Sequence, residues 1–285
     1  MALTKVKGSV WNQEDNETTA LDKAASVLLT PVAGRTLTVL SSDGGLFKAV
    51  TGAAAATYSD NGGSYCGTVF IPTGGDGSAA WVRDYSGAGD VKWFGAVGDG
   101  VTDDTAAFLA AKNAVSAGGI ILFPPSATAY VISSVDFTGK SATISGYGAT
   151  ISCTSATGAI YKTDHDNKLS VFGLTFSGTS TYRAINFQAT ESGTAYDELI
   201  IEDCSFDMGS GIYGIYSVGG REHRINRCTF YNTTSGCGTY FKKTVSPFVT
   251  NCTFRGANYV GRAVYYPGTG TAYDAGLVLR DCEIL

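Results

Sequence analysis

The feature that most constrains the fold is a short pattern that recurs five times in the second half of the chain. Each copy has an apolar residue, a variable residue, a turn-prone residue, a cysteine or apolar residue, a variable residue and a closing aromatic or aliphatic residue. The copies are Val171–Phe176, Ile201–Phe206, Ile225–Phe230, Val249–Phe254 and Leu279–Ile284. Their closing residues lie 30, 24, 24 and 30 positions apart. A repeat of this length, made of short β-type runs, is typical of a solenoid.

The residue types narrow the choice of solenoid. The copies lack the leucine and asparagine template of leucine-rich repeats and have no helical period, which leaves a parallel β-helix. The third position of each copy is predicted to form a tight bend between two strands of one coil. Glycine, asparagine and aspartate tolerate the left-handed backbone of such a bend, and arginine fits less well. The bend residues are Gly173, Asp203, Arg227, Asn251 and Asp281.

The fourth and sixth positions are predicted to point inward, because side chains alternate along a strand. One interior column is then Cys204, Cys228, Cys252 and Cys282, and a second is Phe206, Phe230, Phe254 and Ile284. Four cysteines also raise the question of a zinc site. These four lie a full coil apart instead of in CxxC pairs, so we interpret them as free thiols that fill the core and expect no metal.

The stretch FGAVGDGVTDDT, residues 94–105, places three aspartates in a glycine-rich turn. It lacks the alternating oxygen ligands and closing glutamate of an EF-type calcium loop, and it matches neither GxGxxG nor a phosphate loop. Residues 106–116 have helical spacing, and glycines follow them. We therefore predict a structural role, in which Thr102, Asp103 and Asp104 cap this helix.

Composition excludes several functions. The net charge is −5, and no basic stripe is present, so a nucleic-acid partner is not expected. No run approaches the roughly 20 apolar residues that cross a bilayer, and the N-terminus has no signal-peptide pattern, so we expect synthesis in a cytoplasm and no membrane insertion. No cofactor-binding motif occurs, and no cofactor is expected.

The sequence VKWFGAVGDGVTDDTAAFLAAKNAV followed by GGIILFPP resembles the start of the pectate-lyase-like β-helix of bacteriophage tailspikes. Upstream, Gly44–Phe47, Asp60–Gly63, Val69–Gly75 and Ala80–Arg83 resemble the small domain that precedes it. The resemblance covers the chain from about residue 35 to its end. It implies an all-β protein: a right-handed parallel β-helix with a short capping helix that acts as a lid over the first coil, preceded by a small N-terminal β domain.

This resemblance suggests three parts. Residues 1–30 would attach to a phage tail or baseplate protein, although a flexible terminus is the alternative. Residues 31–88 would form the small β domain, and residues 91–285 the N-terminal part of a truncated β-helix. Since the sequence ends inside a coil strand at Leu285, we expect a longer parent chain that carries the rest of the β-helix and any trimerisation region.

The resemblance also implies a function. A homotrimeric tailspike on the virion tail, made in the host cytoplasm, would recognise a bacterial surface polysaccharide such as a capsule or O-antigen, and the full-length parent would depolymerise it. A non-enzymatic fibre or adaptor is the main alternative. A free pectin-degrading enzyme is a third, and the N-terminal module and the missing signal peptide count against it.

Outward columns supply the candidate site residues. Hydrolysis needs two carboxylates about 5–9.5 Å apart, and Asp207 and Glu202 are the candidates. Elimination needs a base and a cation that neutralises a uronate, for which Asp207 with Tyr231 and Arg255 is equally suited. A further column, predicted as Asn186, Tyr216, Tyr240 and Val264, would bind sugar through flat tyrosine faces. The lone histidines, His165 and His223, are predicted to lie on the surface or in loops.

Overall fold

The computed structural model describes residues 4–6, 9–12, 17–163, 167–178, 183–188, 198–208, 213–231, 237–256, 263–267 and 276–285, with side chains from residue 17 onward. The chain forms two compact units. The first comprises Met1–Ala96 and Ala107–Val115, and the second comprises Val97–Ala106 and Ser116–Leu285. No helix among the described residues is long and apolar enough to cross a membrane.

The first unit is built on a sheet that has seven strands in the described part of the chain, in the order β1-β2-β3-β4-β5-β7-β6. The strands are β1 (Thr4–Val6), β2 (Ser9–Asn12), β3 (Glu17–Ala20), β4 (Thr36–Val39), β5 (Gly45–Thr51), β6 (Val69–Phe70) and β7 (Ala79–Arg83). Neighbours pair antiparallel except β3 and β4, which are parallel. Helix α1 (Lys23–Ser26) lies between these two strands in the sequence. The expected boundary after residue 30 therefore falls between two paired strands of one sheet.

The core of this sheet follows the alternation of its strands. Leu37 of β4 and Phe47 of β5 are fully buried, and the Phe47 ring meets Phe70 edge-to-face at 4.9 Å. Trp81 of β7 packs in the same cluster and donates its indole N–H to the Leu29 carbonyl. Arg83 is also buried, and it donates hydrogen bonds to the carbonyls of three loop residues. This arginine thereby satisfies loop carbonyls that burial would otherwise leave without partners.

Shorter elements accompany the sheet of the first unit and precede the β-helix in the sequence. They are η1 (Gly52–Thr57), β8 (Ala88–Asp90), η2 (Val91–Phe94) and α2 (Thr105–Ala114). The helix predicted after the aspartate-rich loop is α2, and its buried residues are Ala107, Phe108 and Ala111. Its expected role as a lid over the first coil stays a prediction.

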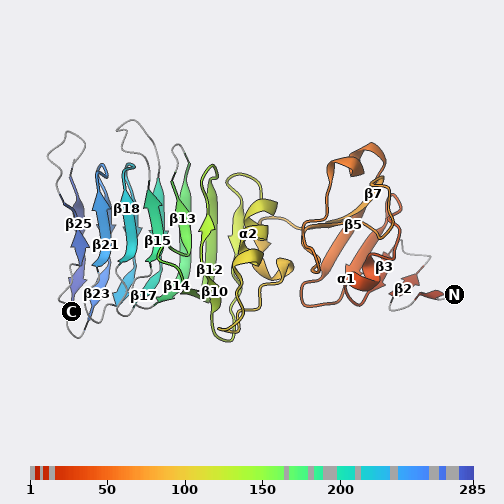
Figure 1. Ribbon diagram of the computed structural model, residues 1–285, viewed down its shortest axis with the longest axis horizontal. Coiled ribbons are helices and arrows are strands. Elements are labelled where there is room, and N and C mark those ends of the chain that lie inside the picture. Colours follow the sequence, from red (N-terminus) through yellow and green to blue (C-terminus); the bar gives the residue numbers. More distant parts are fainter. Residues whose placement is uncertain are drawn as a thin grey trace. The chain divides into compact units, whose positions relative to one another are not determined.

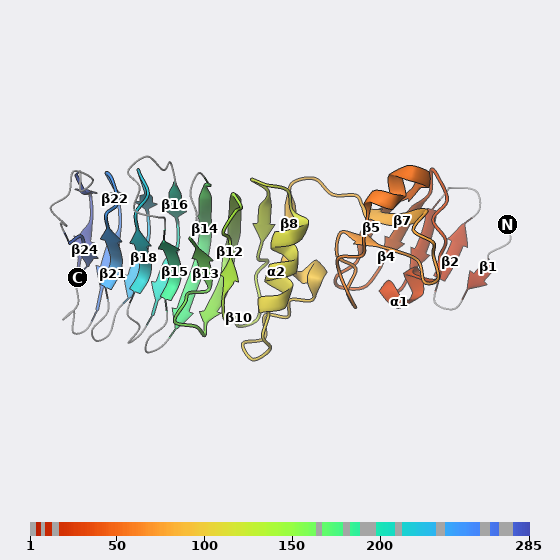
Figure 2. The ribbon, with the colours of Figure 1, turned by 45° about the horizontal axis from the view of Figure 1, so that its top comes forward.

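The second unit is a parallel β-helix. Its smaller sheet has the order β11-β13-β15-β18-β21-β24, and these strands are β11 (Val135–Asp136), β13 (Ile160–Lys162), β15 (Arg183–Gln188), β18 (Tyr213–Val218), β21 (Cys237–Lys242) and β24 (Val264–Tyr265). Each strand pairs in parallel with the equivalent strand of the next coil. Figures 1 and 2 show successive coils side by side in chain order.

The larger sheet of this unit bends once in each coil. Its strands are β9 (Ile120–Leu122), β10 (Tyr130–Ile132), β12 (Ala142–Cys153), β14 (Leu169–Gly178), β16 (Leu199–Glu202), β17 (Ser205–Asp207), β19 (Arg224–Asn226), β20 (Thr229–Tyr231), β22 (Phe248–Thr250), β23 (Thr253–Arg255), β25 (Val278–Arg280) and β26 (Glu283–Ile284). Strand β14 pairs with β16 through its first half and with β17 through its second half. One bent strand is thus replaced by two short strands in the next coil.

The bend occurs where the repeat predicts it. Its five residues all have left-handed backbone, with φ between 50° and 66°. Arg227, the residue that fits this conformation least well, donates from Nε and Nη2 to the Asp203 carboxylate of the preceding coil, at 2.6 and 2.9 Å. The two charge-assisted hydrogen bonds offset the unfavourable backbone of a long side chain at this position.

The predicted phenylalanine column is confirmed. Phe176, Phe206, Phe230 and Phe254 lie in register on adjacent strands and are at most 1 % exposed. Consecutive rings stack at 5.2, 4.8 and 4.9 Å with interplanar angles of 5–7°. Ile284 continues the register on β26 and is 67 % exposed. Each coil therefore buries its ring between the rings of its two neighbours.

The cysteine column forms as predicted beside it. Cys204, Cys228 and Cys252 are buried, whereas Cys282 is partly exposed. Each of the four sulfur atoms lies within 3.5–3.7 Å of a carbonyl oxygen of the preceding coil, as Cys228 does with Ile201. Burial raises the pKa of the Cys228 thiol well above its ordinary value. Thiols that contact carbonyl groups fill space in this core.

His223 lies just before β19, and its ring is fully buried, so the predicted surface placement is wrong. Its Nδ1 accepts the backbone N–H of Leu199 at 3.2 Å, and Nε2 lies 3.2 Å from the Gly219 carbonyl. Because Nδ1 accepts a hydrogen bond there, Nε2 carries the ring hydrogen and the imidazole is neutral. Burial lowers the pKa of His223 to about 4. The other histidine, His165, lies outside the described residues.

We predict that Phe230→Ala lowers the free energy of unfolding by about 3–5 kcal/mol, because it removes a ring stacked on both faces and leaves a cavity. Urea titration followed by circular dichroism measures the change. The matched control is Tyr231→Ala, which truncates the neighbouring ring at a position that is 40 % exposed. Equal losses in the two variants would contradict the stacked interior.

We also predict that the β-helix loses stability as the pH falls from about 6.5 towards 4. Unfolded histidine binds a proton near pH 6.5, whereas the buried ring resists protonation until about pH 4. The unfolded state therefore gains protons first, and the free energy of unfolding decreases by up to about 1.4 kcal/mol per pH unit in this window. Urea titrations at several pH values measure the slope. His223→Gln should flatten it, and an unchanged slope in that variant would refute the assignment to His223.

Candidate functional site

The three aspartates of the FGAVGDGVTDDT loop organise backbone. Asp104 is 2 % exposed, and its carboxylate accepts the N–H groups of Val97 and Gly98 at 2.7 and 3.1 Å. Asp103 accepts the N–H of Thr105, the first residue of α2, at 2.9 Å. Burial raises the pKa of Asp104, and the hydrogen bonds oppose this effect.

The neighbouring Asp99 closes a small turn within the same loop. Its carboxylate accepts the backbone N–H groups of Val101 and Thr102 and the Thr102 hydroxyl. The Thr102 hydroxyl thus donates to Asp99, and the Asp104 carboxylate accepts N–H groups that precede it in the chain. Of the three predicted capping residues, Asp103 is the one whose side chain accepts an N–H of α2 in the described part of the chain. No group of three or more potential metal ligands occurs among the described residues.

The column predicted for catalysis lies on the second half of the bent sheet. Asp207 of β17, Tyr231 of β20 and Arg255 of β23 are directly in register on adjacent strands. All three side chains are exposed. The strand spacing of about 4.8 Å places the three groups along roughly 10 Å of the outer face. The Asp207 carboxylate makes no hydrogen bond or ion pair with another residue in the described part of the chain.

Glu202, the second predicted carboxylate, lies on the other side of the bend at the end of β16. It is in register with Asn226 of the next coil, and Nη2 of Arg227 donates to it at 3.0 Å. Glu202 is therefore in an ion pair with Arg227, whereas Asp207 is in the same register column as Tyr231 and Arg255. A bend separates the two carboxylates along the chain.

Two of the residues predicted to bind sugar form a stack on the smaller sheet. Tyr216 of β18 and Tyr240 of β21 are in register, with ring centroids 4.8 Å apart and an interplanar angle of 8°. Each ring covers one face of the other, the Arg183 guanidinium lies over Tyr216, and the Tyr265 ring lies beside Tyr240. Ring edges and hydroxyls are therefore the parts left for a ligand. Burial, and then the neighbouring Tyr216, raise the pKa of Tyr240, which keeps its hydroxyl protonated as a donor.

The rest of this column differs from the prediction. Asn186 is in register with Tyr216 but only 2 % exposed, and its amide donates to the Thr157 carbonyl. The residue in register with Tyr240 on β24 is Tyr265, not Val264. The count along the sequence was wrong by one residue, because the connection before β24 is one residue longer. The ring of Tyr265 lies 5.2 Å from that of Tyr240.

Sequence reasoning missed a cation at one end of this stack. The guanidinium carbon of Arg183, on β15, lies 4.2 Å from the centroid of Tyr216 and 5.7 Å from that of Tyr213. The Nε of Arg183 is buried and has no hydrogen-bond partner among the described residues. In the sequence Arg183 is an isolated arginine. Its contact with the tyrosine rings becomes evident only from its register beside Tyr213. A guanidinium over stacked phenols suits a polyhydroxylated ligand that carries negative charge.

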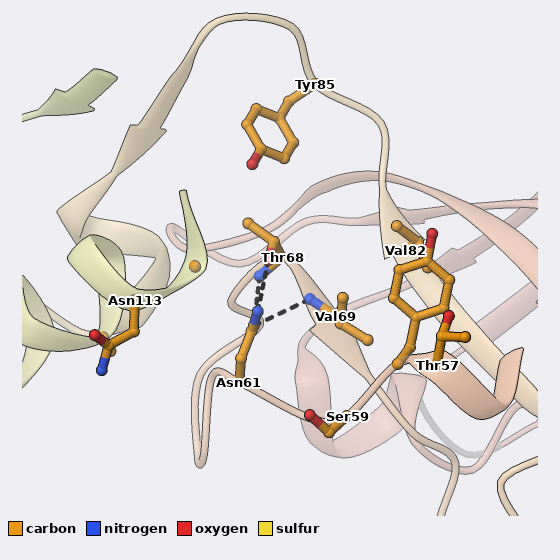
Figure 3. Close-up of a pocket in the computed structure, with 11 residues that line it drawn as sticks. Thr57, Ser59, Asn61, Thr68, Val69, Val82, Tyr85 and Asn113 are labelled. Atoms are coloured by element: carbon orange, nitrogen blue, oxygen red, sulfur yellow. Dashed lines mark hydrogen bonds between the residues drawn. The ribbon is translucent and has the colours of Figure 1, made fainter. Parts of the chain in front are cut away.

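The first unit contains a cavity of about 620 Å³ that sequence reasoning did not anticipate (Figure 3). Figure 3 labels Tyr85, Asn113 and Asn61 among the residues that line it. The Asn61 side chain accepts the N–H groups of Thr68 and Val69, so it serves the local backbone. The lining consists of hydroxyl, amide, tyrosine and apolar side chains, without the carboxylate or imidazole that bond cleavage by acid–base catalysis requires.

No family model matches the sequence, and no curated protein matches it either. Solved structures do resemble the fold. The tailspike protein of Acinetobacter phage vB_ApiP_P1 is 15 % identical, with a TM-score of 0.52 over 84 % of this chain and 50 % of that one. The tailspike protein of Acinetobacter baumannii phage AM24 is 15 % identical, with a TM-score of 0.48 over 93 % of this chain and 64 % of that one. The fold is the parallel β-helix of phage tailspikes.

A bacterial protein has a similar tailspike-like fold. Pantoea stewartii WceF, described as a glycan biofilm modifying enzyme, is 12 % identical over 93 % of this chain and 51 % of its own, with a TM-score of 0.45. The present tailspike-like chain thus spans between about half and two thirds of the length of these three structures.

We predict that Asp104→Ala lowers the free energy of unfolding of the tailspike-like unit by about 1–3 kcal/mol, because two backbone N–H groups lose their acceptor. Asp104→Asn retains one acceptor oxygen and should lower the free energy of unfolding by less. Urea titration measures both. Val101→Ala, at a position that is 86 % exposed in the same loop, is the control and should change stability by less than about 0.5 kcal/mol. A loss no larger than that of the control would contradict the structural role of Asp104.

Proposed function

We propose that this chain is part of a phage tailspike that binds a bacterial surface polysaccharide, such as a capsule or O-antigen, and that its full-length parent depolymerises it. The fold supports a place on the virion tail. The observation that carries the proposal is the exposed, in-register column of Asp207, Tyr231 and Arg255. A carboxylate, a phenol and a guanidinium on adjacent coils present three different hydrogen-bonding groups along one line, as an extended glycan requires.

Elimination is the reaction that this column supports best. Arg255 would neutralise a uronate carboxylate, which acidifies the neighbouring C–H bond, and Tyr231 would remove that proton. The electron pair forms a carbon–carbon double bond, and the glycosidic C–O bond on the adjacent carbon breaks. The departing oxygen takes up a proton from the Tyr231 hydroxyl, and an unsaturated uronate remains. Asp207 would hold sugar hydroxyls next to Tyr231.

Hydrolysis is the second candidate reaction. It would use Asp207 and Glu202 as the pair of carboxylates. The ion pair between Glu202 and Arg227 and the bend between the two acids argue for the eliminative route.

The remaining parts of the proposal concern assembly. Residues 1–30, which supply β1–β3 and α1 to the first unit, attach to a phage tail or baseplate protein, and residues 31–88 complete that small β domain. The β-helix within residues 91–285 belongs to a homotrimer. The Arg183–Tyr216–Tyr240 stack binds the glycan through hydroxyl groups and the guanidinium, with Asn186 as a support beneath it. A fibre that binds the host surface without cleaving it is the alternative, and the experiment below separates the two.

The test uses an array of purified bacterial capsular polysaccharides and O-antigens. We expect this chain to bind at least one of them. We expect the full-length protein to release ultraviolet-absorbing unsaturated uronates from that polysaccharide. Tyr231→Phe should lower that release by about 100-fold or more, since a general base contributes about that factor. Tyr58→Phe, on an exposed tyrosine of the first unit, is the control. New reducing ends without unsaturation would favour hydrolysis, binding without cleavage would favour the fibre, and no binding at all would refute the proposal.

A further inference from the structure

A β-bulge in β12 projects a tyrosine from the surface of the β-helix. Ser145 pairs with Phe172 and Ala149 with Leu174, so Gly146, Tyr147 and Gly148 lie opposite a single residue, Gly173. A Cβ at residue 146 would overlap the Leu174 side chain, and residue 148 has a φ of 85°. The bulge therefore depends on a glycine at both sides of the tyrosine. Bulges of this kind re-aim a side chain and recur next to functional sites.

The ring of Tyr147 lies flat on the chain and open to solvent. A Cβ at residue 173 would overlap three consecutive ring atoms at nearly equal distances, which places Gly173 against the face of the ring. The side chain is nevertheless 61 % exposed. One ring face is thus supported by backbone, and the other is free.

Polar groups of the next coils surround this ring at the bend. The Tyr147 hydroxyl donates to the Asp203 carboxylate at 3.4 Å, and Arg227 binds the same carboxylate. Nη1 of Arg227 makes no hydrogen bond with any residue that the structure describes. Asn251 occupies the bend of the following coil. A flat ring, a carboxylate, a guanidinium and an amide therefore follow one another at strand spacing, about 4.8 Å.

We propose that this bend is a second carbohydrate-binding site, in which a pyranose ring stacks its C–H face on the free face of Tyr147. Asp203 accepts hydrogen bonds from the hydroxyls of that sugar, and Arg227 Nη1 donates one to it or to the next sugar along the coils. The inference rests on the proposed function, because the ligand is a segment of the same polysaccharide. A tyrosine needed only for stability would bury its ring, whereas here three glycines hold an exposed ring in place.

The test measures binding to the same array of capsular polysaccharides and O-antigens. Tyr147→Ala should weaken binding to the polysaccharide retained by the wild-type chain by about tenfold, the equivalent of one lost stacking contact. Tyr147→Phe keeps the ring and should stay within about twofold of the wild type. Tyr147→Leu fills similar space without a flat ring, and its binding to the polysaccharide should be weakened as much as that of the alanine variant. Tyr58→Ala is the control, and urea midpoints show that each variant is folded.

The outcomes separate this inference from the proposed function. Wild-type binding that Tyr147→Ala and Tyr147→Leu leave unchanged would overturn the second site and leave the proposed function intact. An equal loss in Tyr147→Phe would also overturn it, because stacking would then not be the interaction. Failure of the wild-type chain to bind any polysaccharide would overturn both.

Discussion

Parallel pairing of each coil with the next is the constraint on which the second unit depends. Register places like residues above like residues, so phenylalanines stack on phenylalanines and thiols lie beside thiols. The same register acts on the outside of the coils. It brings Asp207, Tyr231 and Arg255 together, and it stacks Tyr216 on Tyr240. Interior packing and surface chemistry therefore have one cause.

Much of the β-helix could be predicted because each position of its repeat requires a particular type of residue. The bend requires left-handed backbone, and four of its five residues are glycine, asparagine or aspartate. Arg227 is the exception, and its conformation depends on Asp203 of the preceding coil, a contact that no local pattern reveals. His223 is a similar case: its burial is set by hydrogen bonds to Leu199 and Gly219, which are distant or unremarkable in the sequence.

The candidate site was less predictable, since surface positions follow from register counted across connections of variable length. That count worked from Asp207 to Arg255, where the coils have equal length, and erred by one residue between Tyr240 and Tyr265. Alternation also does not say whether a side chain is reachable. Asn186 has the outward phase but is covered, and Tyr216 and Tyr240 each cover one of the flat faces that were expected to bind sugar. The exposed position of Tyr147 could not be predicted, because a bulge interrupts the inward–outward alternation of side chains along β12.

The unequal coils carry a further consequence. Phe206 follows Phe176 by 30 residues and Phe230 follows Phe206 by 24, yet all three rings stack in one column. The six additional residues fall in the sequence between the paired positions Gln188 and Ile200, whose partners in the next coil are Val218 and Arg224. A molecule built this way can exchange or lengthen the segments at its periphery while its interior stays unaltered. Ligand preference can then diverge faster than architecture.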